Sequence, residues 1–228
     1  GGGHKGGTGA GAWPLAAPTG ATTRLSDLEY KVCARLRLRL PLHLGGLLDR
    51  CRNRRSGDAA EAPAGGGPGG ECGKSLDADG FHALTCLVGG LVIRRHHTLR
   101  DILAAIGREA GYISSTEVYE PAWTRARTNE RGEVEVEQAR LDNRFNGPPN
   151  DPLVYGDVVV SHPESSAWVG AAADQDGGAA EGAAKGKHSR YPPWALPGGR
   201  LVPLSVETFG RWGEEALDWL RDAAHATC

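Results

Sequence analysis

The sequence predicts an α/β fold in which helices flank one mixed sheet, preceded by a short segment that contains cysteine and histidine. Three observations lead to this fold class. Residues 153–161 (LVYGDVVVS) are rich in β-branched side chains, as a buried central strand would be. Residues 96–110 carry apolar side chains at helical spacing. From residue 96 the predicted order is helix, three strands, helix, strand and helix, and elements in this order pack in layers around one sheet.

The first predicted helix covers residues 24–40. Its apolar side chains recur at three- and four-residue spacing: Leu25, Leu28, Val32, Leu36 and Leu40. Ser26 or Asp27 can cap its start, and Pro41 lies at its end. Cys33, inside this helix, is most simply a small packed side chain.

The remaining elements follow in order. After the helix at 96–110, with Gly111 as a C-cap, residues 112–118 are expected to be extended. Strands are predicted at 138–145 and 153–161, separated by the turn sequence NGPPN. A helix at 177–190, a strand at 201–207 and a helix at 213–224 complete the chain.

Two tracts rich in Gly, Ala and Pro, residues 1–23 and 57–70, lack the large apolar side chains that would offset the entropy of ordering. We expect both to be disordered. The organised parts are then a small region at 24–95, interrupted by the insertion 57–70, and a larger domain at 96–228.

The chain has 228 residues, no Met and a net charge of −2. The absence of Met suggests a piece of a longer translated product. No apolar run approaches the ~18 residues that a membrane helix needs, and no signal peptide is visible, so we expect an intracellular, nuclear protein without a membrane partner.

The basic residues are grouped although the net charge is near zero. Three runs stand out: Arg35, Arg37 and Arg39; Arg50, Arg52, Arg54 and Arg55; and Arg94, Arg95, His96, His97 and Arg100. Such patches can bind phosphate, and equally they can be a solvated surface. His96 and Arg100 are one helical turn apart and could grip a phosphate together.

The five cysteines are odd in number and lack a secretory context, which favours reduced thiols over disulfides. Cys72, His82 and Cys86 are three potential zinc ligands within 15 residues. Cys51 is the best candidate for the fourth ligand. The flexible insertion between Cys51 and Cys72 does not exclude it, because the entropy cost of closing a loop grows only with the logarithm of its length. The fallback ligands are Glu71, His96 and His97. The alternative is a set of reduced cysteines in an irregular segment.

Three acids lie on predicted strands: Glu117, Asp142 and Asp157. If strand pairing brings them together, their hard oxygens would select Mg²⁺ or Mn²⁺. Lys185 or Lys187 could then neutralise charge that develops in a reaction. The alternative is surface charge, although an ionised Asp157 before three valines would need a partner or a metal. Glu207 either completes this site or, as we favour, caps and orients the last helix.

Residues 72–228 resemble the C-terminal restriction-like endonuclease region of site-specific non-LTR retrotransposons, which has the PD-(D/E)XK (restriction-endonuclease-like) fold. Three signatures carry the resemblance: the knuckle Cys72, His82 and Cys86 with Cys51 displaced, the tripeptide Arg95-His96-His97, and the pair Leu141-Asp142 and Asp157. The stretches KGKHSRYPP and PLSVETFGRWGEEAL look like later segments of the same family.

The resemblance implies that Asp142 and Asp157 hold a catalytic Mg²⁺ or Mn²⁺, that Glu117 adds a ligand, and that the enzyme nicks target DNA to prime reverse transcription. The motif lysine is not beside Asp157, where Val158 and Val159 follow, so it would come from Lys185 or Lys187. An upstream reverse transcriptase domain and element RNA are further implied partners.

Three functions are therefore considered. The first is a metal-dependent DNA endonuclease with a structural zinc, in which Arg94, Arg95, His96 and Arg100 contact DNA. The alternative is a catalytically decayed nucleic-acid-binding zinc-knuckle module, and a third is a packing scaffold. Convergence of Glu117, Asp142, Asp157 and a lysine in the folded chain favours the endonuclease, and their scattering favours the binding module.

Overall fold

The computed structural model describes residues 25–38, 40–42, 50–54, 70–147, 152–196 and 198–226, the side chain of Arg37 excepted. The described residues form two compact units that meet in sequence between Arg95 and His96. Several predictions lie outside the described residues: the disorder of 1–23 and of 57–69, the side chains of Arg37, Arg39 and Arg55, most of the turn at 146–150, and Cys228.

The unit before residue 96 has little regular structure in its described part. It contains α1 (Asp27–Leu38), α2 (Phe81–Thr85), a 3-10 turn (Val88–Gly90) and the first turn of α3 (Leu91–Glu109). Ser26 caps α1, because its hydroxyl accepts from the amide of Glu29 while the Glu29 carboxylate accepts from the amide of Ser26. This reciprocal pattern is a capping box, and it fixes the start of the helix within the predicted range.

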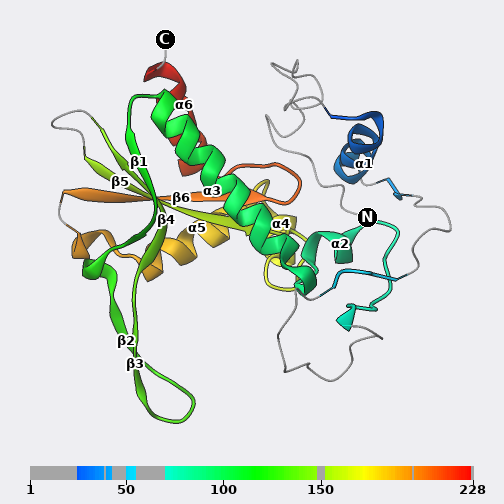
Figure 1. Cartoon of the computed structure of the whole chain (residues 1–228), viewed down its shortest axis with the longest axis horizontal. Helices are drawn as coiled ribbons and strands as arrows, with labels where there is room; N and C mark the ends of the chain where they lie inside the picture. Colours follow the sequence, from blue (N-terminus) through cyan, green and yellow to red (C-terminus); the bar gives the residue numbers. More distant parts are fainter. Residues whose placement is uncertain are drawn as a thin grey trace. The chain divides into compact units, whose positions relative to one another are not determined.

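The unit from residue 96 onward is built on a four-stranded sheet, in the order β1-β4-β5-β6 (Figure 1). The strands are β1 (Ile113–Tyr119), β4 (Arg140–Asn146), β5 (Leu153–Ser161) and β6 (Gly199–Glu207). β1, β4 and β5 pair antiparallel, whereas β5 and β6 are parallel. The predicted α/β class, a mixed sheet flanked by helices, is therefore confirmed. The helices after β5 are α4 (Val169–Asp174), α5 (Gly178–Arg190) and α6 (Glu214–Ala226).

Each face of the sheet has its own core. On one face Phe145, Val158 and Leu204 pack with Leu103 of α3 and Trp219 of α6. The opposite face carries Leu141, Tyr155 and Leu201, packed with Trp123 and Tyr191. Neighbouring positions of β5, such as Val154 and Tyr155, therefore contact different cores, as the two-residue period of a strand requires.

This alternation slips once, on β4. Leu141 and Phe145 are four residues apart, and a regular strand would place them on the same face. Instead Leu141 packs with Tyr155, while Phe145 packs with Val154 on the other face. Opposite the slip, Glu117 of β1 has a φ of 57°, a left-handed conformation that is uncommon outside glycine. Such local irregularities in a sheet redirect side chains, and this one surrounds Asp142.

Three features of this unit differ from the sequence prediction, and the first is the short helix α4 (Val169–Asp174), which is not predicted. The helix predicted at 96–110 begins earlier, at Leu91. A hairpin of β2 (Arg125–Thr128) and β3 (Val134–Glu137), which is not predicted, projects from the sheet (Figure 1). Almost all hairpin residues are exposed: RART has no apolar alternation, and the two alternating valines of VEVE face solvent. None of the helices in the described part of the chain combines the length and apolarity that a membrane span requires.

Candidate functional site

Four potential metal ligands meet in the first unit: Cys51, Cys72, His82 and Cys86. Two short segments on either side of the insertion pair with each other and bring the first two together. The amide of Cys51 donates to the carbonyl of Lys74, and the amide of Cys72 donates to that of Asn53. This antiparallel pairing places Cys51 beside Cys72 although a long insertion separates them in sequence.

A capped helical turn supplies the other two ligands. The Asp77 carboxylate accepts from the amides of Phe81 and His82, each at 2.6 Å, and so caps the start of α2. His82 and Cys86 are four residues apart across this turn, a spacing that puts two side chains on one side of a helix. The role of Asp77 in fixing the first turn of α2 follows from the fold.

The separations between ligand atoms agree with a tetrahedral site. The Sγ atoms of Cys51 and Cys86 are 3.7 Å apart, and Cys72 Sγ is 3.4 Å from His82 Nε2. A tetrahedron with Zn–S bonds of about 2.3 Å has edges of about 3.8 Å, and slightly shorter edges to nitrogen. All four ligand atoms lie within 4.8 Å of one another, so the cluster could hold a metal ion.

The fallback ligands lie elsewhere. Glu71 forms an ion pair with Arg54 at 3.0 Å, and His96 contacts Asp142 in the second unit. His97 is exposed on α3. Without a cation, burial raises the pKa of the Cys51 thiol to about 11, and the neighbouring Cys86 contributes to the rise. A bound cation would be needed to hold such a thiol as the thiolate.

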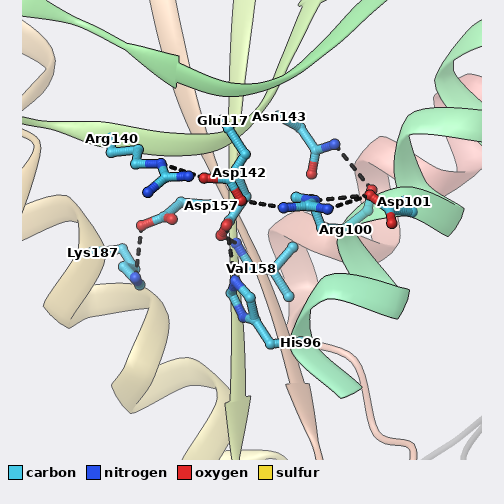
Figure 2. Close-up of polar contacts among 10 residues, drawn as sticks. All are labelled: His96, Arg100, Asp101, Glu117, Arg140, Asp142, Asn143, Asp157, Val158 and Lys187. Carbon is cyan, nitrogen blue, oxygen red and sulfur yellow. Dashed lines mark hydrogen bonds and ion pairs between the residues drawn. The ribbon is translucent and has the colours of Figure 1, made fainter. Parts of the chain in front are cut away.

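The second group of candidate residues is centred on Asp142, where β4 and β5 separate. The ladder between the two strands ends at the pair Asn143 and Gly156, one residue before Asp142 and Asp157 would pair. Beyond that point the amide of Val158 donates to Asp142 Oδ2 at 2.7 Å. The other oxygen, Oδ1, lies 2.8 Å from His96 Nε2 on α3. Figure 2 shows both contacts.

Asp157 of β5 stands opposite Asp142 of β4, just beyond the last paired residues, and each carboxylate affects the pKa of the other. The Lys187 ammonium, from α5, lies 2.7 Å from Asp157 Oδ2. The Asp157 side chain is only 5% exposed and that of Lys187 is 28% exposed, so the pair is accessible through the lysine. Lys185 is exposed, and residues two apart on a helix do not face the same side. Of the two predicted lysines, Lys187 is therefore the one in the site.

Burial and the proximity of the two carboxylates shift the pKa values of the two aspartates in opposite directions. Burial raises the pKa of Asp157 to about 7, and the adjacent Asp142 adds to the rise although Lys187 opposes it. Burial also acts to raise the pKa of Asp142, but the hydrogen bond with His96 and the proximity of Asp157 hold it below its usual value. The hydrogen bond with Asp142 in turn raises the pKa of His96, against desolvation. Two carboxylates this close favour a cation or a shared proton between them.

Glu117 reaches the same region from β1 but is already paired. Its carboxylate forms ion pairs with Arg100 of α3 and with Arg140 of β4 (Figure 2). Glu117 stands between the paired positions Thr116–Asn143 and Val118–Leu141, so it lies across the strand pair from Asp142. Figure 2 shows Glu117, Asp142, Asp157 and Lys187 pointing into one region from four elements.

The four predicted nucleic-acid contacts divide between the two units. Arg94 is exposed, and Arg95 donates to the carbonyl of Leu84 in the first unit. In the second unit His96 contacts Asp142, and Arg100 pairs with Asp101 and Glu117. His96 and Arg100 thus contact three carboxylates, and the phosphate grip by these two residues stays a prediction.

Several contacts have no signal in the sequence. His96 and Asp142 are 46 residues apart, and nothing in their spacing predicts the contact. Glu207 accepts from the amide of Ala180 and thus caps α5, not the last helix, whose Glu214 amide donates to Glu181. The expected cap is corrected accordingly, because the parallel β5–β6 pair places the end of β6 beside the start of α5.

No protein-family model matches this sequence, and the comparison with curated proteins finds no match. The geometry of the two centres therefore carries the functional argument.

Proposed function

We propose that this protein is a metal-dependent phosphodiesterase whose active centre is formed by Asp142, Asp157 and Lys187. More particularly, we propose a DNA endonuclease of the restriction-like type, as in site-specific non-LTR retrotransposons. The observation that carries the proposal is that two buried aspartates stand opposite each other on neighbouring strands, with Lys187 from a different element in contact with Asp157. A mixed sheet flanked by helices agrees with the fold that the resemblance implies.

The donor set suits a hard divalent cation. Asp142 and Asp157 offer carboxylate oxygens, which Mg²⁺ and Mn²⁺ accept, and the pair is too buried to remain doubly ionised without a counter-charge. The only cations in contact with this pair are Lys187 and, when protonated, His96, within the part of the chain that the structure describes. A divalent cation, when bound, would lower the pKa of water and stabilise charge on the scissile phosphate.

Each residue of the centre would have a separate role in the reaction. The Val158 amide and His96 orient Asp142, so that its carboxylate is fixed before substrate binds. Lys187 holds Asp157 and is the accessible cation that would neutralise a non-bridging phosphate oxygen in the transition state. Water would attack phosphorus in line with the leaving oxygen. The P–O bond to that oxygen would break, and a proton would pass to it.

Glu117 would have a supporting role. Two arginines neutralise its carboxylate, so it is a weaker metal ligand than the aspartates. Its partner Arg140 is more than half exposed beside the centre and could contact a phosphate of the bound strand.

We propose zinc for the cluster of Cys51, Cys72, His82 and Cys86, with a structural role. Three thiols and one imidazole are a common zinc ligand set. Among the described residues before His96, the buried apolar side chains are those of two cysteines, Cys51 and Cys86. Because the described residues of this unit bury so few apolar side chains, we expect its folding to need a metal or another crosslink.

The proposed biological role is nicking of target DNA in the nucleus during retrotransposon integration, beside a reverse transcriptase domain. The partners would be DNA, with element RNA as a second candidate.

A plasmid-nicking assay with Mn²⁺ or Mg²⁺ tests the proposal. We expect Asp157→Asn to lower the nicking rate by at least about a hundredfold, because the substitution removes a ligand and the partner of Lys187. Asp222→Asn, at an exposed position of α6, is the matched control and should nick like wild type. Equal nicking by wild type and Asp157→Asn would refute the assignment. DNA binding without nicking by the wild-type protein would favour the decayed binding module.

A further inference from the structure

His96 lies beside the proposed active centre of Asp142, Asp157 and Lys187. A cation site made of oxygen ligands alone would not need this histidine. One oxygen of Asp142 is already oriented by the Val158 amide, which is buried and cannot move without the strand. His96 contacts the other oxygen, Oδ1, which is the one left for a cation. It does so from α3, a helix fixed in the core by Leu103. An imidazole held rigidly at this oxygen is placed to bind the same cation as Asp142.

The separation of the two atoms agrees with joint coordination. His96 Nε2 and Asp142 Oδ1 are 2.8 Å apart. Two neighbouring ligands of an octahedral ion with bonds of about 2.1 Å lie about 3.0 Å apart. A cation could therefore replace the hydrogen bond between them after a shift of a few tenths of an ångström. The His96 side chain is 31% exposed, so the position is open to solvent ions.

The third donor, the imidazole nitrogen of His96, determines which kind of ion the site prefers. Mg²⁺ prefers oxygen ligands and retains its waters, whereas imidazole nitrogen suits first-row transition metals. A site with two carboxylates alone would take Mg²⁺ or Mn²⁺ with little distinction. Addition of an imidazole favours Mn²⁺, and more strongly the later metals.

We infer that His96 Nε2 is a direct ligand of the cation at Asp142 and Asp157, and that this centre is selective for divalent transition metals over Mg²⁺. The inference rests on the proposed function, because it assumes that the two aspartates bind a cation. It also gives the histidine a different role from phosphate contact, which the sequence alone suggests.

The test is Mn²⁺ binding to the full chain, loaded with one equivalent of zinc so that the cysteine cluster is filled and the centre at His96 is left open. Electron paramagnetic resonance gives the affinity, and electron spin-echo modulation detects imidazole nitrogen bound to Mn²⁺. In wild type we expect the nitrogen modulation, and Mn²⁺ affinity at least about tenfold above that for Mg²⁺. In His96→Gln the modulation should vanish and Mn²⁺ affinity fall by about tenfold or more, with Mg²⁺ affinity nearly unchanged.

His97→Gln is the matched control, because His97 is the exposed neighbour on the same helix. It should keep both the modulation and the affinity. His96→Asn, which is shorter and retains a hydrogen-bond donor, provides a second variant should His96→Gln fail to fold. Retained Mg²⁺ binding by either variant shows that the aspartate pair is intact.

The outcomes separate the two proposals. Bound Mn²⁺ without nitrogen modulation in wild type, or modulation that persists in both His96 variants, overturns the role of His96 and leaves the nuclease proposal standing. Failure of wild type to bind Mn²⁺, or binding unchanged by Asp157→Asn, removes the metal centre itself and with it the proposed function.

Discussion

Glu117 combines an unusual backbone with an unusual set of partners. It is the one non-glycine residue in the described chain with a positive φ, and its carboxylate forms ion pairs with two arginines. A residue in this region of φ/ψ space is strained by roughly 1–3 kcal/mol, and the surrounding contacts must hold it there. The Arg100 side chain is mostly buried, whereas that of Arg140 is largely exposed. The buried pair should therefore dominate the energetics.

Substitution Glu117→Gln tests this balance. It should lower the free energy of unfolding by about 1–2 kcal/mol, because a half-buried charged hydrogen bond to Arg100 is weakened. Arg140→Gln should change it by less than about 0.5 kcal/mol, because its pair is screened by solvent. Urea denaturation gives both values. Equal losses in the two variants would contradict the argument that burial decides the contribution of each pair.

Tyr155 should titrate at unusually high pH. Its hydroxyl donates to Glu120 Oε2 at 2.5 Å, and burial together with this carboxylate raises the pKa of Tyr155 to about 12. The folded state therefore holds the proton more tightly than the unfolded state, whose tyrosine pKa is about 10. The stabilisation is complete below pH ~10 and is lost as pH rises through the folded value near 12.

The absorbance of tyrosinate, recorded against pH, measures this shift. Comparison with Tyr155→Phe assigns the step to Tyr155, and in Glu120→Gln the step should move to lower pH because the neighbouring negative charge is gone. A step that stays in place in Glu120→Gln would show that burial alone sets the acidity of this phenol.

At the scale of elements, α5 has to lie close to the sheet and also deliver Lys187. Its buried face consists of small side chains, Gly178, Ala179, Ala180, Ala183 and Ala184. Two further glycines have different surroundings. A Cβ at Gly182 would lie 2.5 Å from the Trp168 ring, whereas a Cβ at Gly186 would meet no atom within 4 Å.

The pair Gly182→Ala and Gly186→Ala should therefore have opposite effects on stability. Gly186→Ala should stabilise the protein by about 0.5–1 kcal/mol, because alanine restricts the unfolded chain and favours the helix. Gly182→Ala gains the same propensity but must displace the Trp168 ring, so we expect a net loss of about 1 kcal/mol. Thermal unfolding of the two variants compares them directly, and stabilisation by both would show that the ring moves freely.

The elements that could be predicted are those with a buried apolar face. The spacing of Leu99, Leu103 and Ile106 and the valines of β5 reflect packing that the sequence records directly. The hairpin β2–β3 buries almost nothing, and its only alternating pattern is the short VEVE of β3, whose valines are exposed. The slip on β4 depends on the backbone of Glu117, and that conformation has no local sequence signal.

The candidate site shows the same limit. Asp142, Asp157 and Lys187 were predictable as types of residue on neighbouring strands and the next helix. The choice between Lys187 and Lys185 required the phase of α5 relative to the sheet, which only packing sets. The His96–Asp142 contact required the position of α3, since it joins residues 46 apart.

For the whole molecule, the two units differ in what stabilises them. The unit from His96 onward has a core on each face of its sheet, with aromatic side chains such as Phe145, Trp219 and Trp123 in contact. In the unit before it, the described residues bury two cysteines and few other side chains. The stability of this first unit should therefore depend on an ion, and that of the second should not.

A metal chelator should destabilise the first unit and leave the second unit folded. Removal of one zinc ion per chain should unfold the segment around Cys51, Cys72, His82 and Cys86, because the ligands are its core and lose their common partner. Hydrogen exchange followed by mass spectrometry would report faster exchange in peptides from 70–95 and unchanged exchange in β5 and β6. Cys72→Ser should resemble the chelated protein, whereas Cys33→Ser, a thiol of α1 outside the cluster, should keep its zinc and its protection. Zinc-independent exchange at 70–95 would exclude a structural ion, and equal acceleration in β5 and β6 would mean that both units fold as one cooperative body.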